Sequence, residues 1–287
     1  MEGQPNTLGI IAGGGELPLA IARAGEADGR SVFVLALDGM AAVAGVAAFP
    51  HAFVSLGELG KAIRLLRDAG CSEVTLAGKV TRPEFSKLKV DVKGALALPK
   101  VIVAATKGDD ALLRALVGLI EDEGFRVVGS TDAAATLAAP LGPIGRLKPT
   151  PEQERDIRQA GKVVLTIGAL DIGQAAVVCA GLVLAVEAAE GTDAMLQRVA
   201  GLPAALRGSA ENRKGVLVKG VKPGQERRVD LPVIGIRTVE LAAAAGLAGI
   251  AVEAGAALIV NRARVAEEAD RRGLFVFGFA PEEQARE

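Results

Sequence analysis

The chain has 287 residues, half of them apolar, with a formal net charge of −1, eight Phe and neither Trp nor Tyr. This length suits two domains, and the near-neutral charge and scarce aromatic rings argue against a protein that binds nucleic acid. The N-terminus carries no signal-peptide pattern, and the longest apolar runs, at 175–186 and 241–252, fall well short of the roughly 20 residues that span a bilayer, so we expect a cytoplasmic protein.

The residue inventory restricts the possible chemistry. His51 is the only histidine, and Cys71 and Cys179 are the only cysteines, each in an apolar setting. One chain therefore cannot assemble a His/Cys zinc site, and the cysteines are typical of small buried side chains in a reducing compartment. Carboxylates, Lys, Arg, hydroxyls and backbone amides remain. That set suits a hard cation such as Mg²⁺ and a phosphate substrate.

Strands and helices alternate in the first half of the chain. Apolar runs bounded by glycine predict buried strands at 7–13, 31–38, 73–78 and 125–130. His51 falls in a predicted loop, and helical periodicity occupies 16–29, 57–70 and 92–124. This order is typical of a parallel, doubly wound sheet, so we predict an α/β protein with a Rossmann-like domain over 1–139.

Residues 140–151 contain four prolines and two glycines, which predicts a linker. The second half, 152–287, opens with a helix and continues with two strands joined in a hairpin at Ala180 and Gly181. A helix and a strand at 215–221 come next, followed by helix, strand, strand, helix and a last apolar strand. We predict a second α/β domain here, carrying catalysis, with a ligand cleft between the two domains.

A glycine-rich turn follows the first strand, in the sequence AGGGELP at 12–18. Gly13, Gly14 and Gly15 would let backbone amides approach a phosphate at the start of a helix, although a tight strand-to-helix turn also explains them. Pro18 stands where the dinucleotide fingerprint requires its last glycine. Asp38 lies where a ribose-binding acid would, so the alternative function is a non-hydrolytic protein that binds NAD or another nucleotide.

Two further polar stretches of the first domain follow predicted elements. AGKVTRPEF comes after the third strand, at the sheet edge where open α/β folds bind ligands, and TKGDDALLR lies at a helix start. A solvated loop and ordinary helix capping are the structural alternatives. As candidate substrate-binding residues we take Lys79, Thr81, Arg82, Lys107, Asp109 and Asp110.

Polar residues also flank the hairpin of the second domain. Gln174 precedes the hairpin, Glu187 follows it, and Thr192 and Asp193 come shortly afterwards. We expect these four residues, together with Asp171 and Glu190, to face one site, and we take the four as substrate-binding residues. Thr192 or Asp193 is equally suited to cap the next helix.

A charged stretch, VKPGQERRVDLPVIG at 221–235, interrupts this largely apolar half. Lys222 and Arg228 supply cations for phosphate, Gln225 supplies an amide, and Asp230 supplies a hard oxygen ligand for a metal. Cations beside a metal-binding carboxylate are the components of phosphoryl transfer. We therefore assign Lys222, Arg228 and Asp230 to catalysis and Gln225 to substrate binding, with a solvated loop of mixed charge as the alternative.

Six segments occur in the order IAGGGELP, GKVTRPEF, KGDDALLR, DIGQAAVV, GLVLAVEAAEGTDAML and KPGQERRVDLPVIG. Together they resemble the two-domain UDP-2,3-diacylglucosamine pyrophosphatase family of the lipid A pathway, and the resemblance covers essentially the whole chain. Lys79 departs from the family pattern, in which a neutral polar residue such as Asn is expected.

The resemblance implies hydrolysis of UDP-2,3-diacylglucosamine to UMP and 2,3-diacylglucosamine 1-phosphate, with a divalent cation, Mg²⁺ or Mn²⁺, at Asp230. It also implies a homodimer, cytoplasmic or peripheral at the inner membrane, that receives its lipid-tailed UDP-sugar substrate from the membrane surface. The single histidine agrees with this reading, because it excludes the His-rich metal centre of the unrelated enzyme type with the same activity.

Overall fold

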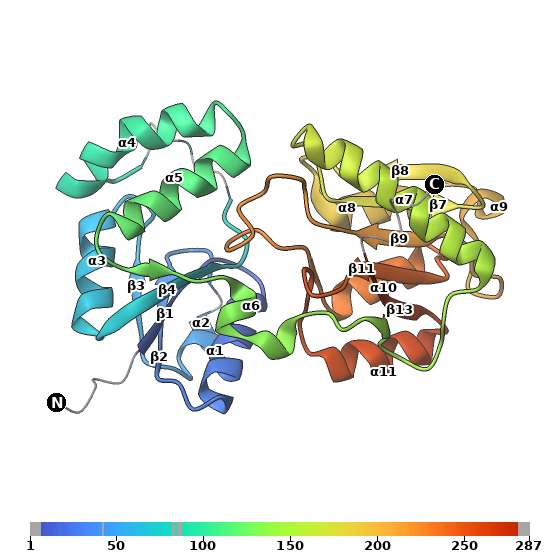
Figure 1. Cartoon of the computed structure of the whole chain (residues 1–287), viewed down its shortest axis with the longest axis horizontal. Helices are drawn as coiled ribbons and strands as arrows, with labels where there is room; N and C mark the ends of the chain where they lie inside the picture. Colours follow the sequence, from blue (N-terminus) through green and yellow to red (C-terminus); the bar gives the residue numbers. More distant parts are fainter. Residues whose placement is uncertain (1–6, 42, 82–83, 85–87, 281–287) are drawn as a thin grey trace. The chain divides into compact units, whose positions relative to one another are not determined.

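The computed structural model describes residues 7–41, 43–81, 84 and 88–280. The chain forms two compact units, which Figure 1 shows in colours that follow the sequence. Unit 1 contains the residues up to Thr136 together with Glu226–Asp230, and unit 2 contains Leu137–Gln225 and the residues from Leu231 onward. The stretch Glu226–Asp230, here called the returning segment, thus lies in unit 1 although its sequence neighbours on both sides lie in unit 2.

Unit 1 is built on a sheet of five parallel strands in the order β3-β2-β1-β4-β5. This is the strand order of the doubly wound dinucleotide-binding fold, which confirms the predicted Rossmann-like domain. The predicted loop at His51 is wrong, because this residue begins β3, which pairs with β2. The strands are β1 (Thr7–Ala12), β2 (Val32–Leu37), β3 (His51–Val54), β4 (Cys71–Ala77) and β5 (Arg126–Val127).

The helices of unit 1 surround this sheet (Figure 1). The predicted helix over 92–124 is two helices, because Gly108 adopts a φ of 121°, outside the helical region, and caps the second of them. Val229 of the returning segment packs against a core that includes Leu35, Leu66 and Val117. The helices are α1 (Leu17–Ala27), α2 (Val43–Val46), α3 (Leu59–Asp68), α4 (Val92–Ala105), α5 (Asp109–Glu121) and α6 (Ser130–Ala133), and a 3₁₀ turn follows at Ala135–Leu137.

Unit 2 contains a mixed sheet in the order β6-β13-β11-β9-β7-β8, in which β13, β11 and β9 are parallel. The predicted hairpin is confirmed, with Ala180 (φ 50°) and Gly181 (φ 80°) at its turn. A two-stranded parallel sheet joins β10 (Val233–Ile234) to β12 (Leu258–Ile259). The strands of the large sheet are β6 (Gly142–Pro143), β7 (Ala175–Cys179), β8 (Leu182–Val186), β9 (Val216–Lys219), β11 (Gly249–Glu253) and β13 (Phe275–Phe279).

The segment predicted as a linker, 140–151, instead supplies part of unit 2. Gly142 and Pro143 pair with β13 at the edge of the sheet, where a proline is tolerated because no neighbour needs its missing N–H. Pro151 begins the next helix, and the side chain of Thr150 accepts a hydrogen bond from the Gln153 amide to cap it. Proline and glycine here mark an edge strand and a helix start.

Helices cover both faces of the unit 2 sheet. Side chains alternate along each strand, so neighbouring residues of one strand pack against different helices. Val178 of β7 and Val218 of β9 pack with α7 on one face, whereas Val177 and Leu217 pack with α8, α10 and α11 on the other. Among the described residues, no helix is both long and apolar enough to cross a bilayer. The helices are α7 (Pro151–Ala169), α8 (Gly191–Ala200), α9 (Ala204–Arg207), α10 (Ile236–Ala244) and α11 (Arg262–Arg272).

Candidate functional site

A buried lysine stands at the carboxyl end of β9 in unit 2. Lys219 is 5% exposed, and its Nζ donates to the Thr192 hydroxyl at 2.9 Å and to the Val233 carbonyl oxygen at 3.3 Å. Removing an ammonium from water is unfavourable unless other polar groups surround it. The sequence therefore places a cation where parallel strands end, the edge at which open α/β sheets bind ligands.

Glu187 completes a polar chain with this lysine. It follows β8 and is 7% exposed, and its Oε1 accepts a hydrogen bond from the Thr192 hydroxyl at 2.6 Å. Its Oε2 accepts from the Gln174 amide at 3.1 Å. Because β7 runs antiparallel to both β8 and β9, the residue before β7 meets the residues that end its two neighbours. Three of the predicted residues, Gln174, Glu187 and Thr192, therefore lie together around Lys219.

One further feature of this cluster bears on ligand binding. The side-chain oxygen Oε1 of Gln174 is buried and has no hydrogen-bond partner among the described residues. An unsatisfied buried acceptor is rare in proteins and is commonly paired with a ligand or an ordered water. Glu253, at the end of β11, is also buried and accepts from the Val221 amide at 3.0 Å.

The helix after this cluster begins earlier than predicted. Glu190 occupies the N-cap position of α8, so neither Thr192 nor Asp193 caps the helix. The Thr192 hydroxyl is thereby left to bond Glu187, as described above. Asp193 lies in the first turn and pairs at 2.8 Å with Arg237, an ion pair at the surface.

Lys222 and Gln225 lie close to each other in the loop that follows β9. The Nζ of Lys222 pairs with Asp171 at 2.9 Å, and this lysine side chain is 13% exposed. The backbone amide of Lys222 donates to the Gln225 side-chain oxygen at 3.0 Å. The α7 end approaches the loop closely at Gly168, where an added Cβ would lie 3.1 Å from the Lys222 Cα. This packing fixes the backbone from which the lysine extends.

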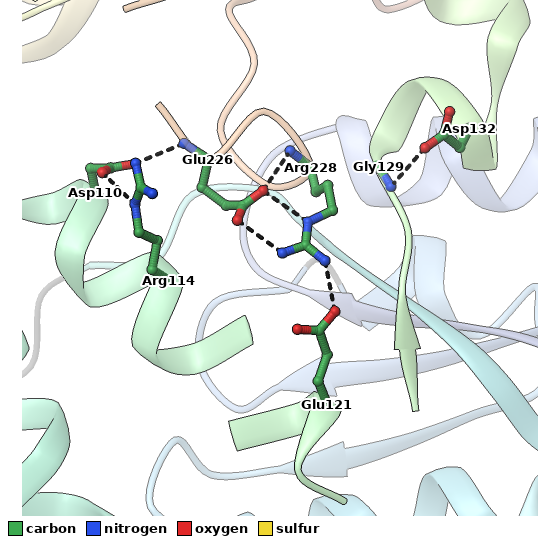
Figure 2. Close-up of polar contacts among 7 residues, drawn as sticks. All are labelled: Asp110, Arg114, Glu121, Gly129, Asp132, Glu226 and Arg228. Atoms are coloured by element: carbon green, nitrogen blue, oxygen red, sulfur yellow. Dashed lines mark hydrogen bonds and ion pairs between the residues drawn. The ribbon is translucent and has the colours of Figure 1, made fainter. Parts of the chain in front are cut away.

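The returning segment is held in unit 1 by a network of charges, drawn in Figure 2. Arg228 forms a two-pronged pair with Glu226, through Nε to Oε1 and Nη2 to Oε2 at 2.9 Å each, and its Nη1 donates to Glu121 at 2.7 Å. The Glu226 amide donates to Asp110 at 2.8 Å, and Asp110 also accepts from Arg114. Helix α5 therefore binds the segment through its first turn and its last residue.

These contacts shift the affinities of the charged groups for protons. The guanidinium of Arg228 holds the pKa of the Glu226 carboxyl below its usual range. In return, Glu226 and then Glu121 raise the pKa of Arg228. Asp110, which was expected either to bind substrate or to cap a helix, here holds the segment, because Gly108 is the cap of α5.

Asp230 ends the returning segment, half-buried, with its backbone amide 3.3 Å from the Glu226 carbonyl oxygen. Nowhere in the described part of the chain do three or more His, Cys, Asp or Glu side chains gather in a way that could hold a metal ion. Asp230 as the metal ligand stays a prediction. So do the catalytic roles of Lys222 and Arg228, which bond here to carboxylates of the chain itself.

The glycine-rich turn is packed against the end of β4. The amides of Gly13 and Gly14 donate to the carbonyl oxygens of Ala77 and Lys79 at 2.9 and 2.7 Å. A Cβ on Gly13 would lie 2.6 Å from the Lys79 oxygen, so close backbone packing alone explains this glycine. Gly15 differs, with a φ of 91° and open space beside it, and its amide is the better candidate for binding an anion.

The contacts described above do not bring the remaining predicted residues of unit 1 together. Thr81, Lys107 and Asp109 are exposed, and Arg82 lies outside the described residues. Sequence reasoning missed Lys219 and Glu253. Their signal was a charged residue at the end of an otherwise apolar strand, in VLVK and GIAVE.

Known proteins resemble the chain over both units. Residues 7–137 match the LpxI N-terminal domain, and residues 140–277 match the LpxI C-terminal domain. The UDP-2,3-diacylglucosamine pyrophosphatase LpxI of Caulobacter vibrioides is 52% identical over 277 residues, which cover 96% of this chain and 99% of that protein. A solved crystal structure, that of gox2253, aligns with a TM-score of 0.32 and 12% identity over 99% of this chain and 92% of its own, too low to support an argument. The resemblance seen in the sequence is confirmed, and the chain belongs to the LpxI family.

Proposed function

We propose that this protein hydrolyses the pyrophosphate bond of UDP-2,3-diacylglucosamine, giving UMP and 2,3-diacylglucosamine 1-phosphate for lipid A synthesis. The observation that carries the proposal is the 52% identity, over nearly all of both chains, to a protein named as the pyrophosphatase for this substrate. The match of both halves to LpxI domains supports the same reading.

The charged groups described above suit a pyrophosphate substrate. Lys222 and Arg228 are cations that neutralise phosphate oxygens, and Arg228 presents the planar pair of donors that suits two oxygens at once. Both are bonded to carboxylates, so substrate binding exchanges these partners for phosphate oxygens. Lys219 stays buried and holds Thr192 in place through its ammonium. Pyrophosphate cleavage needs cations that neutralise the phosphate oxygens, because negative charge is spread over the transferring phosphoryl group.

The donors present suit a hard divalent cation, Mg²⁺ or Mn²⁺, with Asp230 as its protein ligand. Mg²⁺ commonly binds through one or two carboxylates together with phosphate oxygens and water, without a full protein cage. Softer ligands are poorly placed, since burial raises the pKa of the Cys71 thiol to about 11 and His51 Nδ1 lies 2.7 Å from the Phe49 carbonyl oxygen. A bound cation would polarise a phosphoryl oxygen and favour attack by water.

The experiment is release of UMP from detergent-dispersed UDP-2,3-diacylglucosamine by the purified protein, with Mg²⁺, with Mn²⁺ and with excess EDTA. We expect release with either metal, loss with EDTA, and recovery when Mg²⁺ is added back. No release under any condition would overturn the hydrolase proposal, and NAD binding in the same preparation would then favour the nucleotide-binding alternative. Undiminished release in EDTA would overturn the metal requirement alone.

A further inference from the structure

The outward face of α4 is apolar. Val92 and Leu96 are 82% and 80% exposed, and Val103 is 56% exposed. Their spacing of four and seven residues places them on one stripe of the helix. The opposite side carries the buried residues Gly94 and Ala105 and, at the same helical spacing, the half-buried Leu98 and Val101. Helix α4 is therefore apolar on both faces, whereas an ordinary surface helix turns a polar face to solvent.

The stripe does not hold α4 in place. The helix contacts α5 and α3, and it forms the outer layer of unit 1 over them (Figure 1). Its first turn is fixed by Asp91, which accepts from the Gly94 amide at 2.7 Å and from the Lys61 amide at 3.0 Å. A Cβ on Gly94 would lie only 2.1 Å from the Gly57 carbonyl oxygen, so the backbones approach directly. The inward face is thus packed closely without Val92, Leu96 and Val103, which stay exposed.

The charged residues within α4 are both basic. The sequence of α4, VKGALALPKVIVAA, contains two lysines and no acidic residue, and Lys89 and Lys107 lie just before and just after it. Lys93 and Lys100 pair with Glu123 and Asp122, which follow α5. An apolar stripe bordered by lysines matches an anionic lipid surface, where side chains enter the acyl boundary and ammonium groups meet headgroups.

We propose that α4 is the element through which this protein binds an anionic membrane surface. Val92, Leu96 and Val103, together with Pro99 and Ile102 beside them, enter the interface, and the lysines contact the headgroups. This inference goes beyond the proposed reaction, because it concerns how the protein reaches a lipid phase. It is testable without substrate.

The test is sedimentation with vesicles of phosphatidylcholine containing phosphatidylglycerol, and with vesicles of phosphatidylcholine alone. The test variant is Leu96→Ser/Val103→Ser. The matched control is Leu141→Ser/Leu206→Ser in unit 2, which removes leucines that are 68% and 42% exposed. We expect the parent to bind the anionic vesicles more strongly than the neutral ones and less strongly in high salt. The α4 variant should bind roughly tenfold less or weaker still, and the control should match the parent.

Two outcomes would overturn the proposal. The first is a parent protein that does not sediment with anionic vesicles, and the second is an α4 variant that binds them as the parent does. If that variant also forms a smaller oligomer by light scattering, the stripe is an interface between copies. Melting temperatures equal to that of the parent show that each variant is folded. UMP release from detergent-dispersed substrate, measured in parallel, separates failure of this inference from failure of the hydrolase proposal.

Discussion

Replacing Glu226 by Gln should loosen the returning segment without unfolding either unit. The substitution keeps the size of the side chain but removes the charge that Arg228 contacts through two parallel bonds. The backbone amide of residue 226 can still donate to Asp110, and Arg228 can still bond Glu121. The variant therefore isolates one ion pair among the contacts that dock the segment.

The size of the effect follows from the geometry and exposure of the pair. The two bonds are 2.9 Å long, and the side chains of Arg228 and Glu226 are 37% and 15% exposed. A hydrogen bond to a charged group contributes about 1.5–3 kcal/mol, whereas exposed ion pairs contribute about 0–1 kcal/mol. Because solvent screens the charge of Arg228, we assign to its pair with Glu226 about 1–2 kcal/mol of the free energy that docks the returning segment. The undocked population then rises roughly five- to thirtyfold, at about 1.4 kcal/mol per factor of ten.

Trypsin measures this population, because the segment contains Arg227 and Arg228 and cleavage needs an undocked chain. When opening is fast, the cleavage rate follows the open population. Mass spectrometry of the fragments identifies cuts after these two residues. The control is Glu190→Gln, which removes a carboxylate paired with Arg198 at 2.6 Å in unit 2. Equal cleavage of parent and Glu226→Gln at this segment would refute the docking role of the pair.

Three further predictions concern pH, the predicted metal ligand and the buried lysine. Since Arg228 lowers the pKa of Glu226, the stability from this pair is fully present above the ordinary Glu pKa of about 4.3 and is lost as pH falls through the lowered value. Between about pH 6 and about pH 3 the melting temperature of the parent should fall more than that of Glu226→Gln, and parallel curves would contradict this. Asp230→Ala should reduce UMP release roughly a thousandfold with little change in melting temperature, and near-normal turnover would place the metal elsewhere. Lys219→Met should destabilise the protein by about 3 kcal/mol in urea unfolding, because it leaves the Glu187 carboxylate buried without its cation network. Combining it with Glu187→Gln should recover part of that loss, and strictly additive losses would show that the two residues act independently.

Much of the fold could be predicted from local sequence, because its strands are apolar runs bounded by turn residues. β1 and the β7–β8 hairpin are examples, the latter marked by its Ala180-Gly181 turn. The predicted loop at His51 failed because β3 is four residues long, with an exposed histidine at its start. The break at Gly108 was missed because the residues on both sides favour helix, and only three residues, 106–108, separate α4 from α5.

The site was only partly predictable, because it depends on contacts between distant residues. Gln174, Glu187 and Thr192 could be grouped because a hairpin brings its two ends together. Lys219 joins them through strand pairing between β7 and β9, which the local pattern does not specify. The contact of Glu226 with Asp110 joins residues 116 apart in sequence, and no local sequence pattern predicts it. Hence sequence reasoning identified charged segments but not their partners.

The returning segment also restricts where the gene could be cut into fragments or recombined with that of a relative. The chain passes from one unit to the other after Thr136, after Gln225 and after Asp230, so neither unit is one continuous stretch. A fragment ending near residue 136 would lack Val229, which packs against the core of unit 1, and the partners of Asp110 and Glu121. A chimera of two relatives would therefore need three junctions, because a single crossover would pair one parent's α5 with the other's segment. Substitutions in α5 and in residues 226–230 are thus expected to be inherited together.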